Sequence, residues 1–148
     1  MVPWMRRVLV GLTVLLLCSC QVGRVDYREV DIPDESAGDI WQQVVTYANS
    51  RGRRADPEET DPGLRIYTST WAGSTAAFGR GSRERFHVRI EPMRRSTGWV
   101  LRFHCEVHRL EYFSPANPAE SDWEFVGQNR AVEDEFERFM KITYKLKD

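Results

Sequence analysis

Two segments of alternating apolar and polar residues, 85–91 and 99–110, constrain the fold of this chain most strongly. A period of two is typical of β-strands that bury only one face. The inward positions are even-numbered in the first segment and odd-numbered in the second, so the numbers of antiparallel partners must sum to an odd value. We expect a sum near 189, which pairs Val88 with Leu101 across a six-residue turn.

The opposite face of these two strands is polar. It carries arginine, imidazole and carboxylate side chains, namely Arg85, His87, Arg89, Arg102, His104 and Glu106. We therefore expect a sheet with one dry face and one wet, cationic face.

The remaining elements follow from periodicity and turn signals. Apolar residues at helical spacing predict helices over about 36–51 and 130–146, and β-branched and aromatic residues predict a strand over 64–71. Residues 73–82 and 111–128 are expected to be loops, and Val30–Ile32 to lie either in a tether or in an N-terminal edge strand. The order helix, three antiparallel strands, helix predicts an α+β fold with both helices on one face of the sheet.

The N-terminal segment has the pattern of an export signal. Arg6 and Arg7 precede a short apolar run, residues 8–17, and small residues then precede Cys20. A permanent membrane-spanning helix needs about 20 apolar residues, so this run is too short to be one. We expect a removed signal over 1–19, a tether over 20–33 and a single domain over 34–148.

The end of that signal, Leu17-Cys18-Ser19-Cys20, resembles the lipobox of bacterial lipoproteins. The resemblance implies cleavage after Ser19, transfer of a diacylglycerol to the Cys20 thiol, and acylation of the new amino group. Gln21 stands where an Asp is used to retain such proteins, so the resemblance also implies an outer-membrane anchor that faces the periplasm. The alternatives are an inner-membrane anchor and plain secretion.

The predicted domain also has a looser resemblance. Its element order, together with the segment Gly63–Trp71 after the first helix, is similar to the helix-grip domains of the BamC/NlpB lipoproteins of the β-barrel assembly machinery. The similarity is one of topology over about residues 34–146. It implies a fold and no functional residue, because the same fold supports many functions.

Charge and composition narrow the function classes. Without Arg6 and Arg7, 19 of the 21 basic residues remain against 22 acidic ones, a net charge of −3. Nucleic-acid binding needs a basic domain, so we expect no nucleic-acid partner. The glycines around Phe78-Gly79-Arg80-Gly81 lie between two predicted strands and not before a helix, which argues against a phosphate-binding loop.

Cys105 and the histidines are the candidates for chemistry. Cys105 lies on the apolar parity, so we interpret it as a small buried hydrophobe and not as a nucleophile. His104 and His108 are four residues apart on one strand, roughly 13 Å at about 3.3 Å per residue, and cannot share a metal ion. His87 and His104 approach across the strands beside Glu106, but a sum of 189 makes them diagonal. The sequence therefore favours a solvated or Arg-paired surface, with no metal, cofactor or catalytic residue.

Aromatic residues beside arginines suggest an interaction surface instead. If the even positions of 64–71 face the core, Tyr67 and Trp71 lie on the wet face; in the other register they belong to the core. Our candidate interaction face comprises Tyr67, Trp71, Arg85, Arg89 and Arg102. We expect a non-enzymatic, lipid-anchored accessory or structural module of the cell envelope, with an envelope protein as partner that contacts either this sheet face or the 73–82 loop. The sequence leaves the oligomeric state open. The alternative is a module that binds a small or lipidic ligand between the sheet and a helix.

Overall fold

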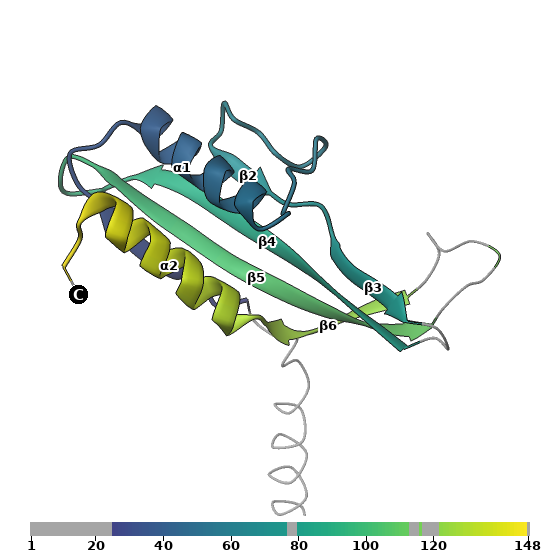
Figure 1. Ribbon diagram of the computed structural model, residues 1–148. Helices are drawn as coiled ribbons and strands as arrows, with labels where there is room; N and C mark the ends of the chain where they lie inside the picture. The colour runs from purple at the N-terminus through teal and green to yellow at the C-terminus, as the bar shows by residue number, and fades with distance from the viewer. Residues whose placement is uncertain (1–24, 77–79, 113–115, 117–121, 148) are drawn as a thin grey trace, which may run out of the picture.

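A computed structural model describes residues 25–76, 80–112, 116 and 122–147 of the chain (Figure 1). Its elements are, in order, β1 (Arg28–Ile32), α1 (Ala37–Ser50), β2 (Ile66–Thr68), β3 (Ala72–Ala76), β4 (Arg80–Pro92), β5 (Trp99–Tyr112), β6 (Asp122–Gln128) and α2 (Arg130–Tyr144). The predicted signal and Cys20 lie outside the described residues, as do positions 77–79. No helix in the described part of the chain has the length and apolar character needed to cross a membrane.

The fold is α+β, with a single antiparallel sheet of six strands (Figure 1). The long strands β4 and β5 pair at the centre, and each has two short partners along its outer edge. β1 and β6 pair with β5, while β2 and β3 pair with β4. The α+β class is confirmed, and three strands was too low a number.

The missed strands explain the difference. β3 and the start of β4 lie largely within residues 73–82, and β6 forms the end of residues 111–128; both segments were expected to be loops. Residues 72–76 are small and polar, so they lack the apolar alternation that predicts a strand. β1 contains Val30–Ile32, so the edge-strand alternative is correct and the folded part begins by Arg28, inside the range expected to be tether.

The register of β4 against β5 differs from the expected one by two residues. Val88 pairs with Phe103, and the partner numbers sum to 191. Odd parity is confirmed, but 189 was wrong, because parity excludes a slip of one residue and allows a slip of two. The turn closes with Met93 N–H donating to Gly98 O at 3.1 Å. Gly98 has φ +118°, and a Cβ there would lie 2.6 Å from Ile32 O, so only glycine fits.

The hydrophobic core gathers the inward residues of the sheet and side chains of both helices. Phe86 of β4 is fully buried, and its ring contacts Tyr47 of α1 at 6.0 Å and Phe136 of α2 at 5.0 Å. Phe136 also meets Phe103 of β5 edge-on at 4.8 Å. Phe86 therefore contacts both helices, and Phe136 of α2 contacts both central strands.

Both helices begin at side-chain caps. Ser36 Oγ accepts from Asp39 N–H at 3.1 Å at the start of α1. Asn129 accepts from Val132 N–H at 3.3 Å at the start of α2. α2 ends at Tyr144, two residues before the expected boundary, and Lys145 takes the left-handed conformation with φ +54°.

Glu133 ties the start of α2 to the sheet. Its carboxylate is fully buried and accepts from Cys105 N–H at 3.0 Å, from Gln128 Nε2 at 2.9 Å and from Arg130 at 2.7 Å. A buried carboxylate is tolerated when several donors and a cation satisfy it in this way. This network fixes the point at which β6, β5 and α2 meet.

Candidate functional site

The outer face of the sheet, defined by the odd-numbered residues of β4 and the even-numbered residues of β5, faces away from the core. Its central part carries a group of imidazoles, a carboxylate and aromatic rings: His87, His104, Glu106, His108, Trp71 and Trp123. We call the first three of these residues the His–His–Glu cluster.

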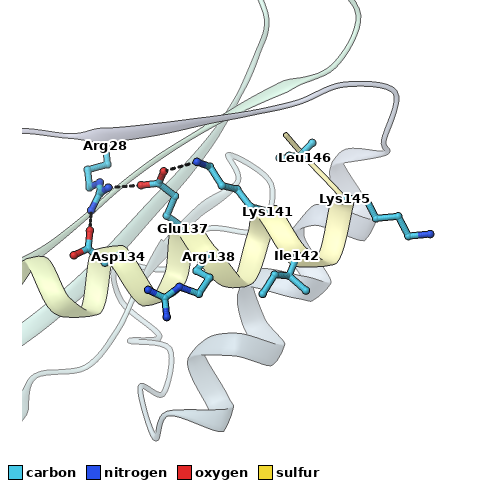
Figure 2. A pocket seen from close by; sticks show the side chains of 8 residues that line it. All are labelled: Arg28, Asp134, Glu137, Arg138, Lys141, Ile142, Lys145 and Leu146. Atoms are coloured by element: carbon cyan, nitrogen blue, oxygen red, sulfur yellow. Dashed lines mark hydrogen bonds and ion pairs between the residues drawn. The ribbon is translucent and has the colours of Figure 1, made fainter. Parts of the chain in front are cut away.

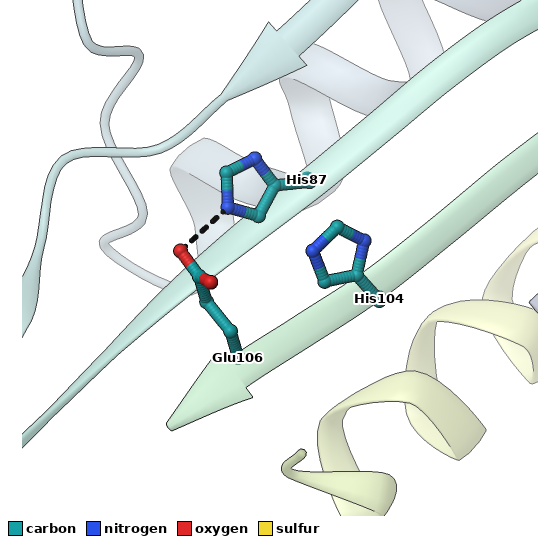
Figure 3. A group of neighbouring side chains, drawn as sticks. All are labelled: His87, His104 and Glu106. Carbon is teal, nitrogen blue, oxygen red and sulfur yellow. Dashed lines mark hydrogen bonds and ion pairs between the residues drawn. The ribbon is translucent and has the colours of Figure 1, made fainter. Parts of the chain in front are cut away.

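The His–His–Glu cluster is compact because of the strand register. His87 of β4 and His104 of β5 are directly paired, and Glu106 follows two residues after His104 on the same face (Figure 3). The imidazole rings stack with centroids 4.5 Å apart and planes 13° apart. One ligand atom from each of the three residues lies within 4.8 Å of the others. The expected diagonal arrangement was wrong, and the shift to 191 makes this pair direct.

Neighbouring groups hold the cluster in place. His87 Nε2 and Glu106 Oε1 are 3.0 Å apart, and on the other side of the ring His87 Nδ1 lies 3.3 Å from Thr68 Oγ1. The second oxygen of Glu106 lies 3.4 Å from His108 Nε2. Tyr27 packs its ring edge-on against His104 at 4.6 Å. The side chains of His87 and Glu106 are thus oriented from two sides.

His104 is the most buried member of the cluster. It is 5% exposed, and its Nδ1 atom is buried without a hydrogen-bond partner in the structure. Burial lowers the pKa of His104 to about 4, and the charge of His87 acts in the same direction against the opposing effect of Glu106. The imidazole of His104 is therefore neutral at pH 7 and has an unshared lone pair.

Glu106 is ionised despite its partial burial. Burial raises the pKa of its carboxyl, but the hydrogen bond from His87 and the charges of His87 and His108 outweigh that effect and bring the pKa to about 2. The cluster thus combines neutral imidazole with a carboxylate, the donor set that suits zinc-like ions.

An arginine stacked between two tryptophans lies beside the cluster. The Arg83 guanidinium carbon is 4.0 Å from the centre of the Trp71 ring and 4.3 Å from that of Trp123. Trp71 also contacts His108, with ring centroids 4.6 Å apart. Burial lowers the pKa of Arg83, with a smaller contribution from Arg85 in the same direction. We call Trp71, Arg83 and Trp123 the Trp–Arg–Trp stack.

The structure removes Tyr67 from the candidate interaction face. Tyr67 pairs with Val88, is 1% exposed, and its hydroxyl donates to Arg53 O within the core. The even positions of β2 face outward instead, as shown by Thr68 opposite His87. Trp71 lies after β2, on the outer face and half-buried. The two aromatics that the sequence analysis treated together therefore lie on opposite faces.

The three arginines of the candidate interaction face have different surroundings. Arg85 is 7% exposed and saturated, because it donates to Ser69 O at 2.8 Å and forms ion pairs with Glu59 and Asp56. Arg85 therefore holds the segment between α1 and β2 against the sheet, and its guanidinium is not available to a partner protein. Arg89 and Arg102 remain accessible, with side chains 56% and 40% exposed.

Three further members of this face were not predicted from the sequence, namely Arg83, Thr68 and Trp123. Their positions depend on strands that were not predicted in full, β6 among them, and on the outward parity of β2. The alternation of Trp123 and Phe125 was the available signal, because residues two apart on a strand share a face.

A groove along α2 offers a second concave surface (Figure 2). It encloses about 530 Å³, and ion pairs of Arg28 with Asp134 and Glu137 cross it, as does that of Lys141 with Glu137 at 3.1 Å. Only Ile142 and Leu146 in its lining are apolar. Such a charged groove does not suit a lipidic ligand.

The space between helices and sheet, where such a ligand was expected in the alternative interpretation, is occupied by the core. Side chains of α1 and α2 meet those of β4 and β5 there ring to ring, and the described core residues are at most 5% exposed. This packing lends the ligand-binding alternative no support.

Comparison with known proteins adds no identification. The chain matches no protein-family model, and a search of curated proteins found no similar sequence.

Proposed function

We propose that the chain is a lipid-anchored envelope module without catalytic activity, which presents the outer face of its sheet to a partner protein. The observation that carries the proposal is the composition of that face. It combines a half-buried Trp–Arg–Trp stack with exposed arginines, and tryptophan and arginine are enriched where proteins bind one another. In the proposed arrangement α1 and α2 cover the other face.

The charge of the face suggests an acidic partner segment. Arg94 and Arg95 are exposed in the turn between β4 and β5, next to Arg89 and Arg102. Arg94, Arg95 and Arg102 line a groove of about 290 Å³ with Asp31 and Glu91. Arg102 already pairs with Glu29 at 2.8 Å. The arginines of this region outnumber its acidic residues, and this surplus positive charge is available to a partner. Charge complementarity of this kind directs specificity and association rate.

The lipid anchor is proposed on the lipobox resemblance. Four residues, 21–24, separate Cys20 from the first described residue, Val25, and these five residue steps of at most about 3.5 Å reach roughly 18 Å. The start of the described chain is attached to the domain at Asp26. Its N–H donates to Gln128 Oε1 at 3.0 Å, and its carboxylate pairs with Arg130 at 3.1 Å. An acylated Cys20 would hold the domain close to the membrane surface.

Site-specific photo-crosslinking in native membranes tests the docking face. A photoreactive residue replaces Arg89 on the outer face or, as the matched control, Gln42 on the exposed side of α1. We expect an adduct with one envelope protein from position 89 and none from position 42. The adduct from position 89 should disappear when Arg102→Glu is added and persist with Arg102→Lys. Equal adducts from both positions, or an adduct insensitive to Arg102→Glu, would contradict the proposed face.

A further inference from the structure

We propose that the His–His–Glu cluster is a binding site for a zinc-class divalent metal ion. Its ligands would be one ring nitrogen each of His87 and His104 and a carboxylate oxygen of Glu106. The proposal goes beyond the docking function and does not depend on it.

The position of the three residues on the sheet carries the proposal. Residues i and i+2 of a strand point to the same face, and the residue directly opposite i on the neighbouring strand completes a triangle. His104 and Glu106 are such a pair, and His87 lies opposite His104. Two rigid central strands therefore hold all three ligands, and a site on strands is placed more accurately than a site on loops.

The distances are close to those that a bound ion requires. Donor atoms of a tetrahedral zinc site, each about 2.1 Å from the ion, lie about 3.4 Å apart. The three donor atoms are within 4.8 Å of one another here. Side-chain rotations that move these atoms by roughly 1 Å bring them to coordination distance. The two imidazole rings are stacked in nearly parallel planes, so their in-plane lone pairs point side by side and not toward a common ion. The same rotations would separate the rings and turn the lone pairs toward the ion. Three protein ligands leave a fourth position for water.

The groups around the cluster act as orienting neighbours. A histidine that binds a metal through one nitrogen donates a hydrogen bond from the other, and Thr68 Oγ1 stands 3.3 Å from Nδ1 of His87 to accept it. His108 Nε2 lies 3.4 Å from the Glu106 oxygen that does not face His87. His104 Nδ1 is buried without a hydrogen-bond partner, an uncommon feature in folded proteins, and a turn of the ring would bring this nitrogen to the side of His87 and Glu106.

The two arginines nearest to Glu106, Arg85 and Arg83, have other partners and do not neutralise its carboxylate. Arg85 is adjacent to Glu106 across the strands, but its donors are taken by Asp56, Glu59 and Ser69. The Arg83 guanidinium is held between the two tryptophan rings. The carboxylate of Glu106 therefore remains directed at the imidazoles.

Metal titration of the full-length protein, purified in detergent and stripped with EDTA, tests the site. Zinc is added in competition with a chromophoric chelator, and circular dichroism checks the fold of every variant. We expect one zinc equivalent with a dissociation constant of about 10 µM or tighter and no competition by Mg²⁺, which prefers oxygen ligands. His87→Gln and Glu106→Gln should each weaken binding at least tenfold. His108→Gln, which removes only an orienting neighbour, should weaken it less.

Glu91→Gln is the matched control, since Glu91 is an outer-face carboxylate of β4 that pairs with Arg102 at 3.3 Å. It should leave the zinc affinity unchanged. Co²⁺ supplies a second readout, because coordination by His87, His104 and Glu106 should produce visible absorption bands that His87→Gln abolishes. Zinc binding that survives His87→Gln in a folded variant, as binding by the N-terminal cysteines would, overturns the proposal. The absence of binding by the folded wild-type protein at 100 µM zinc overturns it equally.

Discussion

His87 and His104 face each other directly across β4 and β5, with their imidazole rings stacked 4.5 Å apart. The pair depends on the strand register. At a sum of 189 instead of 191, His87 would lie opposite Arg102 and the His–His–Glu cluster would not exist. A change of two residues in register leaves every apolar side chain in the core and changes which polar side chains meet.

The buried, neutral state of His104 predicts a pH-dependent stability. The unfolded chain binds a proton at His104 near the ordinary pKa of 6.5, whereas the folded protein does so only near 4. Between these values the unfolded state holds more protons, so the free energy of unfolding should fall as the pH is lowered from 6.5 to 4, by up to about 3 kcal/mol.

Urea unfolding of the metal-free protein with EDTA at several pH values measures this slope. His87 and Glu106 face His104 and contribute to the wild-type curve, so His104→Leu is the informative comparison. In His104→Leu the free energy of unfolding should depend less on pH between 6.5 and 4, because the contribution of the His104 imidazole is removed. Parallel curves for the two proteins between pH 6.5 and 4 would contradict a buried neutral imidazole.

Removal of the Glu133 carboxylate should destabilise the fold strongly. In Glu133→Ala the Cys105 N–H and the Gln128 amide lose their acceptor and Arg130 loses its buried partner. Arg130 is about half exposed and keeps its pair with Asp26, so the main cost is the buried Cys105 N–H left without an acceptor, about 1–3 kcal/mol. Chemical denaturation should show a loss of this order.

Glu135→Ala is the control for that experiment, because Glu135 pairs with Arg51 at the surface, where both side chains are about half exposed. Its cost should stay below about 1 kcal/mol. Similar costs for Glu133→Ala and Glu135→Ala would show that the network at the start of α2 does not hold the sheet and helix together.

Cys105 should be unreactive in the folded protein. It is fully buried, and burial raises the pKa of its thiol to about 12 from an ordinary value of 9. The thiolate is the reactive form, so its fraction at pH 8 falls by roughly a thousandfold. In a Cys18→Ser, Cys20→Ser background, Cys105 is the only thiol, and a colourless disulfide reagent should release colour only after denaturant is added. Rapid colour release from the native protein would be inconsistent with this burial.

The proposed lipid anchor predicts that Cys20 carries a covalent label. Cells grown with a clickable fatty-acid analogue should transfer label to the wild-type protein and to Cys18→Ser, and not to Cys20→Ser. Unlabelled wild-type protein would remove both the anchor and the outer-membrane placement proposed with it. Label that persists in Cys20→Ser would place the acyl chain on another residue.

The elements that the sequence predicts well are those whose own residues carry a strong period. β4 and β5 follow from alternation, and α1 follows from apolar spacing after Ser36, whose capping role is observed. The register within the correct parity does not follow, because Val88 is equally well buried opposite Leu101 or Phe103. The hydrogen bond from Met93 N–H to Gly98 O, whose numbers also sum to 191, continues the observed register into the turn.

Tyr67 shows why the candidate site was predicted only in part. Residues 64–71 contain apolar or β-branched side chains on both parities, so the sequence leaves the two faces undecided. Pairing with Val88 decides them and sends Tyr67 into the core. Arg83 and Trp123 were missed because their stack joins β4 to β6, which are brought together through β5.

The division of each sheet edge between two short strands has a further consequence. β2 and β3, of three and five residues, share the edge beside β4, and β1 and β6, of five and seven residues, share the edge beside β5. Within the described residues, neither edge exposes a long, continuous row of backbone donors and acceptors. Such interrupted edges discourage strand-to-strand polymerisation, a hazard for any sheet protein concentrated on a surface. A binding partner would thus recognise side chains on the open face, and copies of the chain would resist joining edge to edge.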